Sequence, residues 1–379
     1  MRVAITKSTL RIPPTYFAVS HALRLQGEHE FRFFCYVAQV TDPAVTVPII
    51  EAVPLRSLPF RQRELVMPLF LGRMRGLIQR FRPDVIHQHF ATWSLAAVAA
   101  SKRTGAPLIT TLHGIDVFTA LGPADTAMKR WHQRNFRAAA AQSTVVLAVS
   151  QYLAGQARAA GVPAHKIQVH YQGIDTDYFS PAARGDSRAR VPIVLFVGAL
   201  SARKGLPDLL EASDRLQASH PHELVVVGDG PLRAQLSERV ATGRVRVTGS
   251  IPRDEIREEM RRAHVLVLPT QETNGWREAA GLVLLEAQAC GTPAVAYRSG
   301  GAPEMMAEGL SGLLAAEKNV AELTAALGTV LALPAGEYAA MRVAARAFAV
   351  NERSLARSAE ELSRTYAAAA AGRPETPLS

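Results

Sequence analysis

The sequence predicts an α/β protein made of two domains, each built on a parallel sheet with crossover helices. Short β-branched runs alternate with helical patterns along the whole chain, which is the order that parallel sheets require. The 379 residues also suit two domains of roughly 150–200 residues each. No uninterrupted apolar run reaches the roughly 18 residues that a membrane-spanning helix needs.

Five runs in each half of the chain are predicted to be strands. The first five cover residues 3–6, 31–37, 84–87, 108–111 and 145–149, and the second five cover 193–197, 223–227, 245–248, 265–268 and 294–297. The main helices predicted between them cover residues 66–80, 93–104, 124–141, 207–219, 231–241, 253–263 and 282–289. An Ala-rich helix over 354–370 is expected to pack back on the first domain, and the tail 372–379 is expected to fray.

A domain boundary is predicted over residues 177–190, where Pro181, Gly185 and Asp186 interrupt a polar segment. The N-terminal domain then covers 1–178 and the C-terminal domain 190–350. Open α/β sheets bind ligands beyond the carboxyl ends of their strands. The loops after the strands, facing an inter-domain cleft, are therefore where we expect the chemistry.

The net charge of +10 belongs entirely to the first half of the chain. Residues 1–180 hold 20 Lys and Arg against 10 Asp and Glu, whereas residues 181–379 hold 23 of each kind. This asymmetry favours an anionic partner, either a membrane surface, a lipid pyrophosphate or nucleic acid, or else is only an Arg-rich solvated surface. The basic stretches match no nucleic-acid recognition module, so we expect no nucleic-acid partner. The basic, aromatic segment 129–137 and the seven arginines of 56–82 lead us to predict peripheral attachment to an anionic membrane.

The N-terminus and the cysteines indicate a cytoplasmic protein. Met1 leads directly into strand-like residues and no signal-peptide apolar core follows. The two cysteines, Cys35 and Cys290, are far apart in apolar contexts and are predicted to be buried packing residues without a disulfide.

The strongest motif is the segment E-A-A-G-L-V-L-L-E at 278–286. Two carboxylates, Glu278 and Glu286, flank a predicted helix start, and the backbone N–H groups of Gly281, Leu282 and Val283 can receive a diphosphate there. Glu278 is placed to accept hydrogen bonds from sugar hydroxyls. Glu286 can bind both hydroxyls of a ribose, because a carboxylate offers two acceptor oxygens.

With several other motifs in order, this segment resembles the retaining, GT-B-fold glycosyltransferases of family 4 (glycosyl transferases group 1). The resemblance covers about residues 84–316. It rests on V-S-Q-Y-L at 149–153, Q-G-I-D at 172–175, F-V-G-A-L-S-A-R-K-G at 196–205, G-D-G-P at 228–231, the E-x7-E segment, and the pair Gly300-Gly301. The strand-end segment L-H-G-I-D at 112–116 resembles the family's H-G-x-D, and H-Q-H-F at 87–90 resembles its H-x-H.

The resemblance implies that a sugar of hexose type moves from a nucleotide-sugar to a glycan or lipid-linked acceptor, in bacterial polysaccharide or glycolipid assembly. It implies no cofactor and no metal. We expect front-side displacement, because no carboxylate is evident as a covalent nucleophile. The implied catalytic residues are His113, Arg203, Lys204 and Glu278, and the implied donor-binding residues are Gly198, Gly281, Leu282, Val283 and Glu286.

Two departures from the family pattern concern the phosphates. Family members often carry Arg at the position of Ala199, and here Arg203 is expected to supply that charge. Relatives also carry a Gly-Gly loop after the first strand, where this chain has residues 7–14 without glycine. Its side chains, together with two nearby polar residues, are predicted to line the acceptor or cleft rim: Lys7, Ser8, Thr9, His89 and Asp116.

Two apparent motifs are set aside. The D-T-D sequence at 175–177 is expected to form a turn and not a metal site, and His87 and His89 lack a third ligand at suitable spacing. Two alternative functions remain: a sugar-nucleotide epimerase or hydrolase on the same fold, and a catalytically weak partner that binds nucleotide-sugar. Glu278, Glu286, His113 and Lys204 argue against the weak partner, whereas Ala199 argues for it.

Overall fold

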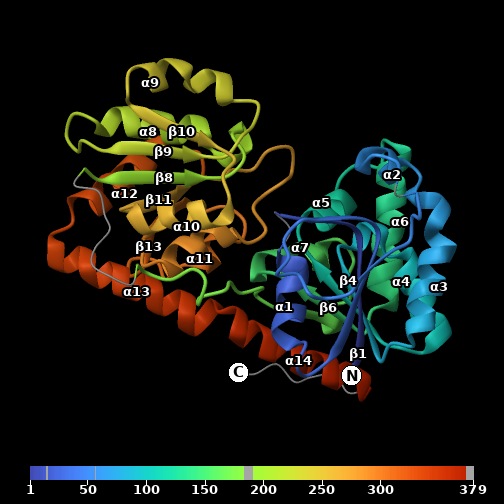
Figure 1. Cartoon of the computed structure of the whole chain (residues 1–379). Helices are drawn as coiled ribbons and strands as arrows, with labels where there is room; N and C mark the ends of the chain where they lie inside the picture. The colour runs from blue at the N-terminus through green and yellow to red at the C-terminus, as the bar shows by residue number, and fades with distance from the viewer. Residues whose placement is uncertain (14–15, 56, 183–190, 373–379) are drawn as a thin grey trace. The chain divides into compact units, whose positions relative to one another are not determined.

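The computed structural model describes residues 1–13, 16–55, 57–182 and 191–372, which form two compact units (Figure 1). The first unit contains Met1–Gln172 together with the chain from Ser358 onward, and the second contains Gly173–Arg357. Of the predicted boundary segment 177–190, residues 177–182 belong to the second unit and residues 183–190 lie outside the described residues. The predicted frayed tail also lies outside them from residue 373 onward.

The first unit is a seven-stranded sheet in the order β3-β2-β1-β4-β5-β6-β7, and all neighbouring strands are parallel. The strands are β1 (Arg2–Ile12), β2 (Glu30–Val40), β3 (Ile49–Glu51), β4 (Val85–His89), β5 (Leu108–Leu112), β6 (Val145–Ala148) and β7 (Ile167–Val169). The helices are α1 (Phe17–Leu25), α2 (Phe60–Leu65), η1 (Met67–Phe70), α3 (Leu71–Phe81), η2 (Ala91–Trp93), α4 (Leu95–Thr104), α5 (Ile115–Leu121), α6 (Ala127–Gln142), α7 (Gln151–Ala159), η3 (Ala164–Lys166) and the C-terminal α14 (Leu355–Ala370).

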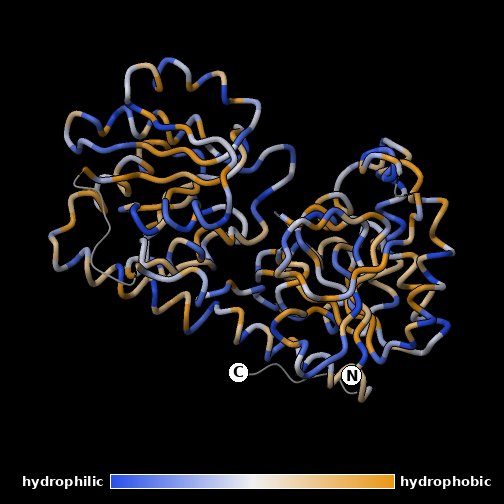
Figure 2. Tube along the Cα trace, in the orientation of Figure 1, coloured by the Kyte–Doolittle hydropathy of each residue, from blue (hydrophilic) through white to orange (hydrophobic). Residues whose placement is uncertain are grey.

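The second unit is a six-stranded parallel sheet in the order β10-β9-β8-β11-β12-β13. Its strands are β8 (Ile193–Val197), β9 (Glu223–Val227), β10 (Val245–Gly249), β11 (Val265–Leu268), β12 (Ala294–Tyr297) and β13 (Gly312–Ala315). Its helices are η4 (Ala202–Lys204), α8 (Leu206–Leu216), η5 (Arg233–Leu236), α9 (Ser237–Ala241), α10 (Arg253–Arg262), α11 (Leu282–Ala289), η6 (Ala302–Met305), α12 (Val320–Ala332) and α13 (Ala335–Arg353). The strands of both sheets are mostly hydrophobic, as the orange inner segments of Figure 2 show, which fits sheets covered on both faces.

All ten predicted strands are present, but the first is longer than predicted. β1 pairs with β2 as far as Ile12 opposite Val40, so Lys7, Ser8 and Thr9 lie within a strand and not in a loop. The prediction of a loop was therefore wrong for residues 7–12, whereas Pro13 lies in a turn and residue 14 is outside the described residues. Polar residues at the carboxyl end of a strand resemble a loop in sequence, although their backbone continues the ladder.

Two predicted helices differ in the structure. The helix predicted over 66–80 begins as the 3₁₀ segment η1, which has Pro68 in its first turn, and becomes α-helical only at Leu71. The helix predicted over 231–241 is a 3₁₀ segment followed by the short α9, and Pro231 precedes both. The strands β3, β7 and β13 were not predicted. β3 and β7 have only three residues each, and β13 begins with a glycine and contains no β-branched or aromatic residue, unlike the Val-rich β6 and β11 of the same length.

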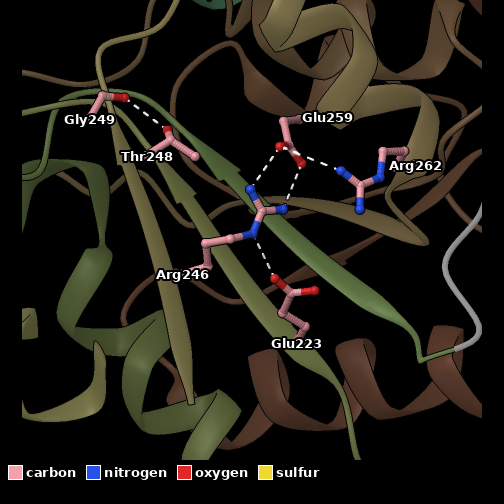
Figure 3. A network of polar contacts seen from close by, with 6 residues as sticks. All are labelled: Glu223, Arg246, Thr248, Gly249, Glu259 and Arg262. Atoms are coloured by element: carbon pink, nitrogen blue, oxygen red, sulfur yellow. Dashed lines mark hydrogen bonds and ion pairs between the residues drawn. The ribbon is translucent and has the colours of Figure 1, made fainter. Parts of the chain in front are cut away.

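An arginine at the edge of the second sheet joins two strands to a helix (Figure 3). The Arg246 guanidinium on β10 donates to Glu223 on β9 at 2.7 Å and to both carboxylate oxygens of Glu259 on α10 at 2.8 and 2.9 Å. A bidentate contact of this kind fixes orientation as well as distance. The network therefore fastens α10 to the sheet, away from the carboxyl ends of β8, β11 and β12.

Within the described part of the chain, no single helix is long and apolar enough to cross a bilayer. α12 and α13 meet that test only together and are bent by 110°. Leu323, Leu327 and Val330 of α12 are buried in the core of the second unit. Both cysteines are buried and free, as predicted.

α14 is joined to the rest of the first unit through four histidine side chains. The ring nitrogens of His21, His29 and His87 lie 2.8, 2.8 and 2.6 Å from the hydroxyls of Ser358, Ser363 and Tyr366. His170 Nε2 lies 2.9 Å from the Ser358 carbonyl oxygen and therefore donates to it. Burial lowers the pKa of all four imidazoles, so they are neutral in the folded chain.

We expect the first unit to lose stability in mild acid. In the unfolded chain these histidines bind protons below about pH 6.5. In the folded chain they stay unprotonated to lower pH, because burial lowers their pKa. Their contribution is therefore complete above pH 6.5 and is lost as the pH falls toward the lowered pKa of the folded state. The unfolding free energy should fall by up to about 1.4 kcal/mol per pH unit for each of the deeply buried His21, His87 and His170.

Urea unfolding at pH 7.5, 6.5 and 5.5 measures this dependence. In a Trp276→Phe background the remaining tryptophans, Trp93 and Trp131, report on the first unit alone. His87→Gln should reduce the slope with pH, and His165→Gln, at an exposed position, should not. Equal slopes in the His87→Gln variant and the parent would contradict the interpretation.

Candidate functional site

In the second unit, Lys204 and Glu278 form a partly buried ion pair. The Lys204 ammonium donates to Glu278 Oε2 at 2.5 Å, and the two side chains are 20% and 12% exposed. Lys204 ends η4 in the segment after β8, and Glu278 lies between β11 and α11. The structure thus brings together two of the predicted catalytic residues that are 74 positions apart.

Arg203 is exposed, and its guanidinium lies over an aromatic ring. Its guanidinium carbon is 3.9 Å from the centre of the Trp276 ring, and Lys204 Nζ is 5.8 Å from the same centre. A cation–π contact of this kind restricts the guanidinium while its N–H groups stay available. We did not predict Trp276 from the sequence, although its position two residues before Glu278 is the signal that could have identified it.

Two glycines, Gly300 and Gly205, allow backbone segments to approach closely on either side of this ion pair. Gly301 N donates to the Glu278 carbonyl oxygen at 2.9 Å, and a Cβ on Gly300 would lie 2.1 Å from that oxygen. A Cβ on Gly205 would lie 1.9 Å from the Pro269 carbonyl oxygen. Gly300 and Gly205 also have positive φ. Glycine is therefore required at both positions for its backbone conformation as well as for the close packing.

α11 begins at Leu282, as predicted, with Gly281 at its N-cap in the left-handed region. A Cβ on Gly281 would lie 3.6 Å from Glu278 Cγ, so the ion pair and the helix start are adjacent. Glu286 is half-buried in the second turn, where burial raises the pKa of its carboxyl and the charge of Arg253 opposes that shift. Gly198 directly follows β8, at the same edge of the sheet as η4.

In the first unit, His113 sits among aromatic rings at the carboxyl ends of β4 and β5. Its ring centre is 4.6 Å from Phe17, 4.3 Å from Phe90 and 5.2 Å from His89. His113 Nε2 lies 3.0 Å from His89 Nδ1, and its Nδ1 lies 3.4 Å from the Gln172 amide nitrogen. Burial lowers the pKa of both imidazoles well below the usual value, so they act as neutral hydrogen-bonding groups.

Asp116 is a cap for the backbone around His113. It is 1% exposed, and its Oδ1 accepts from the N–H groups of His113, Gly114 and Val117 at 3.0–3.1 Å. Its Oδ2 accepts from Ala91 N at 3.1 Å. The carboxylate therefore joins the loops after β4 and β5 and positions the His113 backbone, whereas the sequence analysis placed Asp116 at the acceptor or cleft rim.

Lys7 lies near the same histidine on the central strand β1. Its Nζ donates to the Thr9 carbonyl oxygen at 2.6 Å and lies 5.2 Å from the centre of the Phe90 ring. Burial lowers the pKa of the Lys7 ammonium to about 8. Phe90 has a positive φ of 62°, uncommon for an aromatic residue, and Gln88 supports it by donating to its carbonyl oxygen at 2.9 Å.

The D-T-D sequence forms a turn, as predicted. Asp175 Oδ1 accepts from the N–H groups of Asp177 and Tyr178 at 3.1 and 2.9 Å. No group of three or more His, Cys, Asp or Glu side chains among the described residues is arranged to hold a metal ion. His87 instead contacts Tyr366 and Thr111.

We expect Gly300→Ala to be far more damaging than Gly309→Ala. Both glycines have positive φ, at 59° and 80°, so alanine strains the backbone at either by about 1 kcal/mol. Only at Gly300 does the new Cβ meet an atom, the Glu278 carbonyl oxygen, and nothing lies within 4 Å at Gly309. Thermal melting should show a clearly larger loss for Gly300→Ala, and similar melting temperatures would exclude the close contact.

Family comparisons agree with this division of the chain. Residues 16–178 match the family described as Glycosyltransferase Family 4, and residues 183–348 match Glycosyl transferases group 1. The GDP-mannose-dependent alpha-(1-6)-phosphatidylinositol monomannoside mannosyltransferase of Mycolicibacterium smegmatis is 33% identical over 302 residues, 75% of this chain and 76% of that protein. The D-inositol 3-phosphate glycosyltransferase of Acidothermus cellulolyticus is 31% identical over 320 residues, 76% of this chain and 69% of that protein.

Solved structures show the same fold at lower identity. Anabaena HepE, solved in complex with UDP and glucose, has a TM-score of 0.77 at 19% identity over 97% of this chain and 99% of that chain. The sucrose-phosphate synthase of Thermosynechococcus elongatus has a TM-score of 0.79 at 20% identity over 98% and 100% of the two chains. The chain therefore belongs to the group 1 glycosyltransferases of family 4, and its two parallel-sheet units are those of the GT-B fold.

Proposed function

We propose that the protein transfers a hexose-type sugar from a nucleotide-sugar to a glycan or lipid-linked acceptor, with retention of anomeric configuration and without a metal ion. The observation that carries the proposal is the Lys204–Glu278 ion pair beside the start of α11, with Arg203 on Trp276 next to it. Fixed cations next to a helix N-terminus suit a diphosphate. A carboxylate in the same place suits the hydroxyls of the attached sugar.

The second unit would bind the donor. Lys204 gives one of its three N–H groups to Glu278 and has two left for the diphosphate. Glu278 likewise has a second carboxylate oxygen for a sugar hydroxyl, and Glu286 is our candidate for the ribose. Two buried hydroxyls that follow β11 and β12, Thr270 Oγ1 and Ser299 Oγ, lack a hydrogen-bond partner among the described residues and could also contact the ligand.

The reaction we infer is a front-side displacement. The bond from the anomeric carbon to the diphosphate oxygen breaks while the acceptor hydroxyl oxygen bonds that carbon on the same face, and the hydroxyl proton passes to the departing diphosphate. Lys204, Arg203 and the N–H groups that begin α11 stabilise the charge that develops on the diphosphate. His113 of the first unit, held neutral by burial, is our candidate hydrogen-bond partner for a sugar hydroxyl.

Relatives indicate the kinds of partner to test. A similar mannosyltransferase is named as GDP-mannose-dependent and as acting on a phosphatidylinositol mannoside, and HepE was solved with UDP-glucose. We infer from these names and from the basic first unit that the acceptor of this chain is presented by a membrane or belongs to a surface polysaccharide, at the cytoplasmic face.

A screen of UDP-, GDP- and ADP-sugars for thermal stabilisation tests donor binding, because a ligand at 100 times its Kd adds about 2.7 kcal/mol to stability. The stabilising donor is then incubated with candidate acceptors, and NMR of the product reports the anomeric configuration. An inverted product would exclude retention. Rapid epimerisation or release of nucleotide without acceptor would favour an epimerase or hydrolase.

Lys204→Ala should lower turnover by roughly 10²-fold or more, the scale of losing one charged or hydrogen-bonding contact to a transition state. Arg215→Ala, at an exposed cation that pairs with Glu211 on α8, is the matched control and should leave the rate unchanged. Activity that survives EDTA in the parent enzyme is expected as well. A near-normal rate in Lys204→Ala would show that the diphosphate is held elsewhere.

A further inference from the structure

The segment that runs through α2, η1 and α3 exposes two leucines to solvent. Leu65 and Leu69 are each 81% exposed, more than any other large hydrophobic side chain among the described residues. The opposite side of the segment carries Arg63, Met67 and Met74, which are at most 6% exposed. A helix that covers a core is expected to be polar on its outer side, so two outward leucines need an explanation.

Arginines flank the two leucines at regular spacing. Arg61, Leu65, Leu69 and Arg73 follow one another at intervals of four residues, and all four are exposed. Residues four apart share a side of an α-helix. The Val66 dihedrals stay right-handed helical where α2 meets the 3₁₀ segment η1, whereas Phe70, with φ −103° and ψ 12°, departs from them directly before α3. We call these four residues the α2–α3 stripe.

The surroundings of the α2–α3 stripe are strongly basic. Residues 60–82 contain six arginines and one acidic residue, Glu64. Arg63 is directed inward, where it is paired with Glu51, and the others include the exposed Arg75, Arg80 and Arg82. The helices that carry the stripe lie on the outer side of the first unit, as Figure 1 shows for α3.

Residues 129–137, which the sequence analysis also predicted to contact a membrane, are less suited to binding a bilayer. In α6, Lys129 is paired with Asp125 at 2.9 Å. Phe136 is 2% exposed, and Trp131 packs against the core of the first unit. The aromatic residues of 129–137 therefore support the fold. α6 also exposes Arg130, Arg134 and Arg137, but its most exposed large apolar side chain is Met128 at 51%, against 81% for both leucines of the α2–α3 stripe.

We propose that the α2–α3 stripe is the docking surface for an anionic phospholipid bilayer. Leu65 and Leu69 enter the interfacial region of the lipid, and Arg61 and Arg73 bind headgroup phosphates on either side. Burial of the leucines away from water makes the free energy of membrane binding more favourable. Attraction of the arginines to an anionic leaflet adds a second favourable contribution. The inference makes the membrane partner of the proposed function specific, but it does not depend on which sugar is transferred.

Co-sedimentation of the full chain with phosphatidylcholine vesicles that contain 30% or so of an anionic phospholipid tests the proposal. Leu65→Ser/Leu69→Ser should lower the partition coefficient at least tenfold. Leu310→Ser/Val343→Ser is the matched control, because these second-unit side chains are 65% and 71% exposed, and it should bind like the parent. Unchanged melting temperatures show that each variant is folded.

A second pair of variants separates local binding from net charge. Arg61→Gln/Arg73→Gln should weaken binding to anionic vesicles several-fold, and more than Lys102→Gln/Arg103→Gln, which removes the same charge from exposed positions at the end of α4. Equal losses in the two charge variants, or unchanged binding by the leucine variant, would overturn the proposal.

Two further results would also decide against a bilayer. If light scattering shows a dimer of the parent that Leu65→Ser/Leu69→Ser dissociates, the leucines contact a second copy of the chain. If the parent does not sediment even at low salt, the surface does not bind this lipid. Because no nucleotide-sugar is present, either result leaves the glycosyltransferase proposal untouched.

Discussion

The ion pair of Lys204 and Glu278 is the interaction on which the second unit's candidate site depends. Two charges that are only partly exposed lose hydration, and their attraction compensates only when the geometry is held. The backbone supplies that geometry, since Gly301 donates to the Glu278 carbonyl oxygen and Gly300 lets the two segments approach. Gly205 does the same for Lys204 against Pro269. The glycines thus fix the positions of the Lys204 and Glu278 side chains. Gly281, which caps the start of α11, lies three residues after Glu278 in the same segment.

The first unit organises its polar groups in the opposite way. Four of its histidines, His21, His87, His89 and His170, are buried, burial lowers their pKa, and they bond hydroxyls, a carbonyl oxygen or another imidazole. His113 is held by aromatic contacts and by a backbone that Asp116 caps through four N–H groups. A neutral imidazole can be placed in such surroundings at little electrostatic cost, whereas a charged group would need a partner. A polar sugar, and not a phosphate, is the ligand that such a group suits.

The sequence predicted the fold class, ten of the strands and the start of α11, because apolar β-branched runs and a glycine before an apolar helical run are strong local patterns. It did not predict the short strands β3, β7 and β13, or that β1 continues through Lys7, Ser8 and Thr9. At the site, motifs identified Lys204 and Glu278 but not the contact between them. The roles of Trp276, Phe90 and Asp116 depend on which loops meet, and this information is carried by tertiary structure and not by local pattern.

The excess positive charge of the first unit is separate from its candidate site. At the carboxyl ends of its strands, the described groups around His113 are the His89 imidazole, aromatic rings, the Gln172 amide, the Asp116 carboxylate that caps its backbone, and Lys7, whose ammonium has a pKa lowered to about 8. The arginines of residues 60–82 lie instead on α2, α3 and the turn that follows. A cationic surface next to a diphosphate would strengthen donor binding, but the cations that we propose for that role, Arg203 and Lys204, belong to the second unit, whose residues 173–357 hold 21 Lys and Arg against 22 Asp and Glu. The proposed bilayer partner would account for these arginines, because they lie beside exposed leucines, which a soluble anion would leave in water.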